Sequence, residues 1–100
     1  MKFTGDDLLK TLIPEFVELW IEDIDTEGKE ILSAKKPDDL FRFGHTVKGS
    51  CLQFGFNDLA DIGVRIMKAA KETDWASASS LISELRTKFI EIQDYLKKNK

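Results

Sequence analysis

The sequence predicts an all-α fold, an up-down antiparallel four-helix bundle with a short extra helix at its N-terminus. Three observations support this prediction. Apolar residues recur three and four positions apart through almost the whole chain, and no alternation typical of strands is present. The chain has only 2 prolines and 6 glycines among its 100 residues, so little of it must be turn. The predicted connections are a few residues long, which makes neighbouring helices antiparallel.

The first two predicted helices meet at Pro14. Thr4 is suited to cap a short first helix, with Asp7 completing a capping box. Pro14 disfavours helical geometry at the residue before it and suits the first turn of a new helix, so the second helix is predicted over about 14–34. The apolar residues of the first helix are Leu8, Leu9, Leu12 and Ile13. The inward stripe of the second is Val17, Trp20, Ile24, Gly28 and Ile31, with Phe16 and Leu19 beside it.

The third helix is predicted over about 37–54. Pro37 suits its first turn. Asp38 and Asp39 follow in that turn, where the helix dipole favours negative charge. Gly55 is expected to end the helix. Its predicted core side carries Leu40, Phe43, Gly44, Val47, Cys51 and Phe54.

Two further helices complete the predicted bundle. Asn57 is the expected cap of the fourth, and Thr73 or Asp74 the cap of the fifth. We interpret glycines 44 and 63 as points of close helix–helix contact. The inward residues are Leu59, Ile62, Ile66 and Ala69 in the fourth helix, and Leu81, Ile82, Leu85, Phe89, Ile92 and Leu96 in the fifth.

Composition and charge bear on function and location. The length suits one domain over 1–100. A net charge of −3 argues against nucleic acid, because phosphate backbones need a basic stripe. We interpret the lysines at 97, 98 and 100 as complementing a helix dipole. A lone cysteine, Cys51, fits a reducing cytosol. No signal peptide or membrane-spanning stretch is recognisable, so we expect a cytoplasmic protein, and a monomer because no second apolar stripe is obvious.

The solvent face of the third helix is the candidate functional surface. With Val47 at the centre of the core stripe, His45 lies about 160° away around the helix and is predicted to face solvent. The residues that share its face are Phe41, Arg42, Lys48, Gly49 and Leu52.

Three of these neighbours are unusual for a solvated face. Phe41 and Leu52 are large apolar residues beside the chain's single histidine, which indicates a docking patch, with packing of either one under a neighbouring helix as the alternative. Gly49 costs about 1 kcal/mol relative to alanine inside a helix. Its outward position, one turn after His45, favours close approach by a partner.

Other interpretations of His45 are weaker. A surface histidine without context is usually inert, but Lys48 and Gly49 supply a context. A zinc site fails because one histidine and an inward-facing Cys51 do not make four ligands. A hydrolytic enzyme with His45 as general base lacks a nearby nucleophile and an orienting carboxylate. A helical module that docks partners without any chemistry at His45 remains the alternative function.

Residues 45–50, His-Thr-Val-Lys-Gly-Ser, resemble the H-x-x-K-G-S signature of the histidine-containing phosphotransfer family. Gly55 falls ten residues after the histidine, where that family tends to have glycine. Residues 13–16 resemble the family's entry into its long second helix, and Leu59 and Ile66 match apolar positions after the motif. The departures are mild at Thr46, Val47 and Cys51. Met67 replaces a frequent acidic residue, which puts the choice of partner in doubt.

The resemblance implies that His45 is a phospho-accepting histidine, that Lys48 offsets the charge of the phosphoryl group, and that Gly49 admits the partner. It implies that the chain relays a phosphoryl group between aspartates of response-regulator receiver domains, or receives it from a hybrid sensor histidine kinase. We expect no kinase activity, because no glycine-rich nucleotide loop is present. We also expect no bound cofactor or metal. The Mg²⁺ of the reaction should belong to the receiver.

Overall fold

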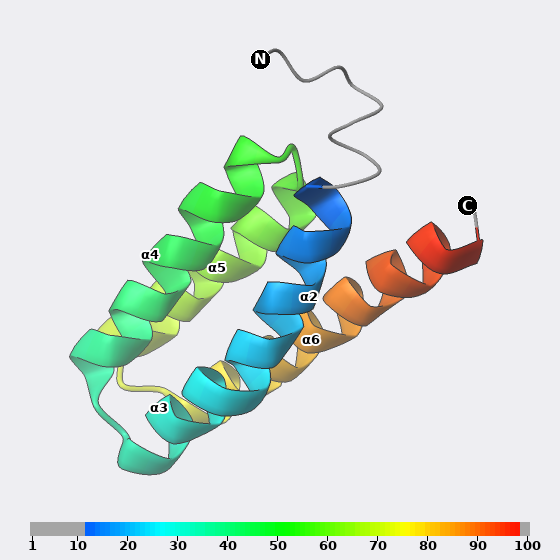
Figure 1. Ribbon diagram of the computed structural model, residues 1–100. Coiled ribbons are helices and arrows are strands. Elements are labelled where there is room, and N and C mark those ends of the chain that lie inside the picture. The colour runs from blue at the N-terminus through cyan, green and yellow to red at the C-terminus, as the bar shows by residue number, and fades with distance from the viewer. Residues whose placement is uncertain (1–11, 99–100) are drawn as a thin grey trace.

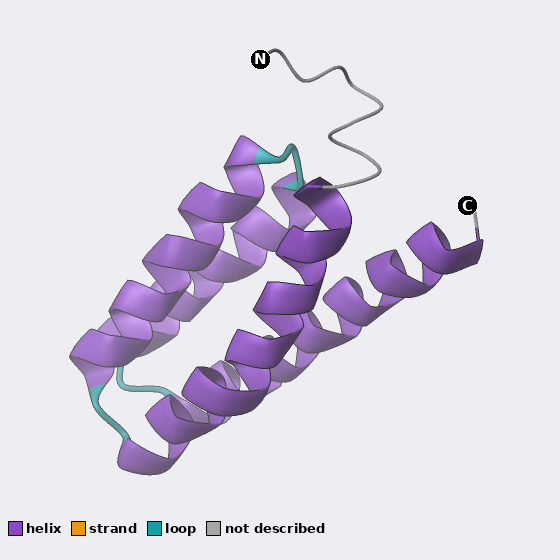
Figure 2. Ribbon diagram, in the orientation of Figure 1, coloured by secondary structure: helices purple, strands orange, loops and turns teal. Residues whose placement is uncertain are grey.

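The computed structural model describes residues 12–98, and over this range it contains helices and no strands. Residues 12–98 form four helical rods (Figures 1 and 2). The first rod is a run of three consecutive segments, and each of the other rods is one helix. The first comprises α2 (Ile13–Asp23), η2 (Ile24–Gly28) and α3 (Lys29–Ala34), and the others are α4 (Pro37–Gln53), α5 (Asn57–Lys71) and α6 (Trp75–Lys98). The helix predicted from Thr4 lies outside the described residues.

The rods are packed so that each lies beside its neighbours in the chain. α4 and α5 make the closest pair, α6 lies along α5 and α2, and α3 reaches α4 (Figure 1). α6 is the longest helix, and its C-terminal end extends beyond the other rods. α4 has two different sides. One side is covered by α5 and the core, and the other side faces solvent.

The core consists mostly of the apolar stripes that the sequence predicts, but Phe54 and Leu96, predicted to face inward, are half-buried and lie outside the cluster of buried residues. The rings of Trp20 and Phe89 stack with centroids 6.1 Å apart, and Phe43 meets Trp20 edge-on at 5.8 Å. Such pairs add to the burial of their apolar area. The largest fully buried side chains are Phe89, Leu40, Ile66, Leu85, Val17, Val47 and Cys51.

Glycine lets α4 and α5 approach closely. A Cβ atom on Gly63 would lie 2.7 Å from the backbone nitrogen of Lys48 and 2.8 Å from the carbonyl oxygen of Gly44. A Cβ on Gly44 would lie 2.8 Å from the carbonyl oxygen of Gly63. The prediction that these two glycines serve helix–helix contact is confirmed. Their contact sets the position of α4 against α5.

The helix ends agree with the predictions except at the starts of α2 and α5. α2 begins at Ile13, so the residue before Pro14 is helical although the proline was predicted to disfavour this, and Pro14 is accommodated in the first turn, where its missing N–H leaves no helical hydrogen bond unmade. Gly55 follows α4 with φ +80, the left-handed conformation that glycine adopts most easily. Asp74 caps α6, because its Oδ1 accepts a hydrogen bond from Ser77 N at 3.1 Å. The predicted cap Asn57 is wrong. α5 begins at Asn57 itself, and the cap position before it is Phe56, which makes no side-chain cap hydrogen bond.

The second predicted helix differs from the expectation in its middle. Its stripe is buried as predicted, but residues Ile24–Gly28 form a π-helical turn between two α-helical segments. This turn carries Asp25, which accepts hydrogen bonds from Arg86 Nε at 2.6 Å and from its Nη2 at 3.1 Å. The bond to Arg86 lowers the pKa of the Asp25 carboxyl. Leu19, predicted beside the stripe, is instead 60% exposed.

Candidate functional site

His45 lies in the middle of α4 on its solvent side, as predicted. It lines a shallow surface depression together with Asp38, Phe41 and Arg42 from the preceding turns. A helical side chain leans toward the N-terminus of its helix, so the imidazole lies over the turn that contains Phe41 and Arg42. The ring is exposed and is held on a rigid element rather than on a loop.

The two residues predicted to serve His45 occupy the expected places. Lys48 is half-buried one turn after His45, with its backbone against Gly63 of α5. Gly49 is exposed, and a Cβ atom added there would meet nothing within 4 Å. No atom of the described residues fills the place where a side chain at Gly49 would stand, so the space beside the imidazole is open to another molecule.

The predicted docking residues separate into exposed and partly covered ones. Leu52 is 50% exposed, and Arg42 is exposed with a loose pair to Asp39 at 3.9 Å. Phe41 does not fully face solvent. It is half-buried against the core, and Lys71 of α5 lies over its ring. The sequence left open that Phe41 packs under a neighbouring helix instead of forming a docking patch. This holds for one side of Phe41, because α5 comes close enough to cover it.

Residues of α5 also adjoin this surface, and of these sequence reasoning named Met67 but missed Val64 and Lys71. Val64 is 44% exposed, and Met67 is half-buried next to Gly44. Val64 lies two residues from both Ile62 and Ile66, about 160° from each around the helix, so its outward position was readable from the helical period. Lys71 lies on the same side of α5 as Val64 and Met67. The apolar and basic surface around His45 is therefore shared by two helices.

The reactive groups near His45 are few. The Thr46 hydroxyl is occupied, since it donates to the carbonyl oxygen of Arg42 at 2.9 Å. Cys51 is buried on the core side of α4, and burial raises the pKa of its thiol to about 12, so the thiol stays protonated and unreactive. The depression at His45 thus offers the imidazole as its nucleophile, with basic side chains nearby.

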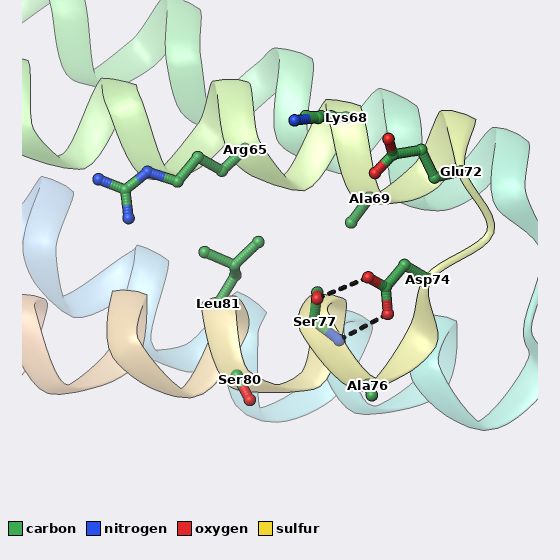
Figure 3. Close-up of a pocket in the computed structure, with 9 residues that line it drawn as sticks. All are labelled: Arg65, Lys68, Ala69, Glu72, Asp74, Ala76, Ser77, Ser80 and Leu81. Atoms are coloured by element: carbon green, nitrogen blue, oxygen red, sulfur yellow. Dashed lines mark hydrogen bonds between the residues drawn. The ribbon is translucent and has the colours of Figure 1, made fainter.

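A second groove lies between α5 and α6, away from His45 (Figure 3). Three of its polar side chains, those of Arg65, Asp74 and Ser77, are engaged within the fold. Asp74 holds Ser77 through both carboxylate oxygens, and Arg65 pairs with Asp61 at 2.6 Å. None of the predicted site residues lines this groove, and its lining offers no separate constellation for catalysis.

Residues 12–98 hold neither a cluster of metal ligands nor a membrane-spanning helix. In this range no three His, Cys, Asp or Glu side chains gather into a group able to hold a metal ion. None of the helices described is both long enough and apolar enough to cross a membrane.

Comparison with known proteins identifies a family. A family model described as the Hpt domain matches residues 9–95, which include His45 and nearly all of the described helices. No curated protein and no solved structure matches the chain.

Proposed function

Because the chain belongs to the Hpt domain family, the histidine phosphotransfer modules of two-component signalling, we propose that it accepts a phosphoryl group on His45 and relays it between receiver domains. The donor is a receiver aspartate or a hybrid sensor histidine kinase, and the acceptor is another receiver aspartate. The observation that carries this proposal is an exposed histidine on α4 with Lys48 and the open space at Gly49 beside it. The proposal includes an up-down antiparallel order of the helices. The contacts of α4 with α5 support this order.

The transfer needs no nucleotide site on this chain. A neutral imidazole nitrogen of His45 attacks the phosphorus of the receiver's acyl phosphate. The P–N bond forms as the P–O bond breaks, and the aspartate leaves as a carboxylate. The proton of the neutral ring stays on its other nitrogen or passes to solvent. The reverse reaction gives the phosphoryl group to the next aspartate, and Mg²⁺ is held by the receiver.

The test is transfer from a phosphorylated receiver domain to the purified chain. Because the chain has a single histidine, the proposal requires one phosphate per chain, labile in acid and stable in alkali. Acid-stable phosphate would indicate a hydroxyl acceptor instead. Receiver binding without any phosphate transfer would favour the alternative function, a docking module that works without phosphorylation.

Replacing Lys48 with alanine is expected to slow transfer about tenfold, the effect of losing roughly 1.4 kcal/mol of charge stabilisation at the phosphoryl group. Quenched-flow transfer at a saturating receiver concentration isolates this step from binding. Lys48→Arg, which keeps the charge, is the control and should retain most of the rate. An unchanged rate in Lys48→Ala, with an unchanged melting temperature, would make Lys48 a surface charge only.

Gly49→Gln and Leu52→Asp are expected to weaken receiver binding at least about tenfold. The first fills the open space beside the imidazole, and the second places a charge in a desolvated contact. Both positions face solvent, so the melting temperature should change little. Calorimetric titration with a receiver measures the affinity. Leu19→Asp on α2 is the matched control, since Leu19 is also an exposed leucine, and it should bind at full strength. Full-strength binding by Leu52→Asp would place the receiver on another face.

A further inference from the structure

Lys71 at the end of α5 lies next to the phosphorylation site although 26 positions separate it from His45. Its Nζ lies 5.5 Å from the centroid of the Phe41 ring. Phe41 lies one turn before His45 on α4, at a Cβ–Cβ distance of about 5–6 Å. Phe41 and His45 line the same depression. The ring is thus bordered by the imidazole on one side and by the ammonium group on another.

The directions of the two side chains bring them together. α4 and α5 run antiparallel, since Gly44 lies near Met67 and Phe41 near Lys71. Helical side chains lean toward the N-terminus of their own helix. His45 therefore leans toward Phe41, whereas Lys71 leans along α5 toward the level of His45. Both converge over the turn of α4 that contains Phe41.

The ammonium group of Lys71 is held only loosely. The ion pairs among the described residues join Arg42 to Asp39, Arg65 to Asp61 and Arg86 to Asp25, and none includes Lys71. A cation over an exposed aromatic ring contributes only about 0.5–1 kcal/mol. A dianionic phosphoryl group attracts a nearby ammonium group more strongly, because charge-assisted hydrogen bonds then form.

We propose that Lys71 is a second cation of the phosphoryl site, which rests on the Phe41 ring in the free protein and moves to the phosphoryl group when His45 is phosphorylated. This inference depends on the proposed function. Lys48 approaches the phosphoryl group from α4, and Lys71 approaches it from α5. The movement also uncovers the ring, so a receiver meets a covered Phe41 before transfer and an open one afterwards.

The experiment uses phosphoramidate as the phosphoryl donor, so that no partner protein is needed. The ³¹P resonance of the phosphohistidine is titrated at low salt in the wild type and in Lys71→Gln. A cation in contact with the dianion stabilises it, so its removal should raise the phosphoryl pKa by about 0.7, the size expected for one charge at about 4 Å in water. Lys71→Arg should keep the wild-type value. Lys88→Gln, the same change on an exposed residue of α6, is the control and should cause no shift.

A second measurement follows the lysine directly. In the free protein, a nuclear Overhauser effect between the Lys71 ε-methylene and the Phe41 ring is expected, and it should disappear on phosphorylation. If the phosphohistidine signal forms but this contact persists and the Lys71→Gln titration matches the wild type, the inference is wrong and the proposed function stands. If no phosphohistidine forms with phosphoramidate or with a phosphorylated receiver, both are wrong.

Discussion

His45→Ala is expected to abolish phosphoryl acceptance completely while the bundle stays folded. The chain contains no other histidine, so no second imidazole can replace the lost nucleophile. The side chain is exposed, so the free energy of unfolding should change by less than about 0.5 kcal/mol. His45→Gln keeps a polar side chain of similar size and should be equally inactive.

The measurement pairs labelling with folding. Each variant is incubated with a ³²P-phosphorylated receiver, and the label on the chain is counted before and after acid treatment. Circular dichroism and a thermal melt show whether the helices remain. Lys88→Gln serves as a folded variant with the site intact and should be labelled like the wild type. If the His45→Ala variant still carries label, His45 is not the phosphoryl acceptor. A lowered melting temperature of this variant would mean that the imidazole has a structural role.

Gly63→Ala is expected to destabilise the protein by about 2 kcal/mol, although alanine is the better helix former by about 1 kcal/mol. The new Cβ would lie 2.7 Å from Lys48 N and 2.8 Å from the oxygen of Gly44, and both are backbone atoms. Backbone cannot rotate away as a side chain can, so α4 and α5 must separate. For a domain of this size, the melting temperature should fall by about 8–16 °C.

Gly49→Ala is the matched control, because it makes the same substitution in a helix of the same pair. A Cβ atom at Gly49 meets nothing within 4 Å, so only the gain in helix propensity remains, and the melting temperature should rise. Chemical denaturation of both variants gives the two free energies of unfolding. Equal stabilisation in Gly63→Ala and Gly49→Ala would mean that the two helices are not in close contact at Gly63.

Separation of α4 from α5 would also affect the site. Lys48 rests with its backbone against Gly63, and Lys71 of α5 covers Phe41 of α4. The basic groups around His45 are therefore placed by the same contact that the two glycines allow. Gly63→Ala should lower the transfer rate as well as the stability.

The sequence by itself determined the helical character of residues 12–98, apart from the π-helical turn, and the direction in which His45 points. Both depend on the rotation of about 100° per residue within one helix, which is a local property. The buried stripe through Val47 and the exposure of His45 and Leu52 follow from it. The same rule would have placed Val64 on the surface of α5. The close contact at glycines 44 and 63 was also predictable, because a glycine on the inward side of a helix lowers helix stability unless it lets another backbone pack against it.

What lies across from each helix was decided only by the tertiary structure. The helical period of α4 predicts which way Phe41 points but not what lies against it. That depends on how far α5 is shifted along α4, and the sequence period of neither helix determines this shift. The close approach at Gly44 and Gly63 sets it, and places Lys71 over Phe41. The start of α5 likewise depended on the packed turn before it, so the cap position fell on Phe56 rather than on the polar Asn57.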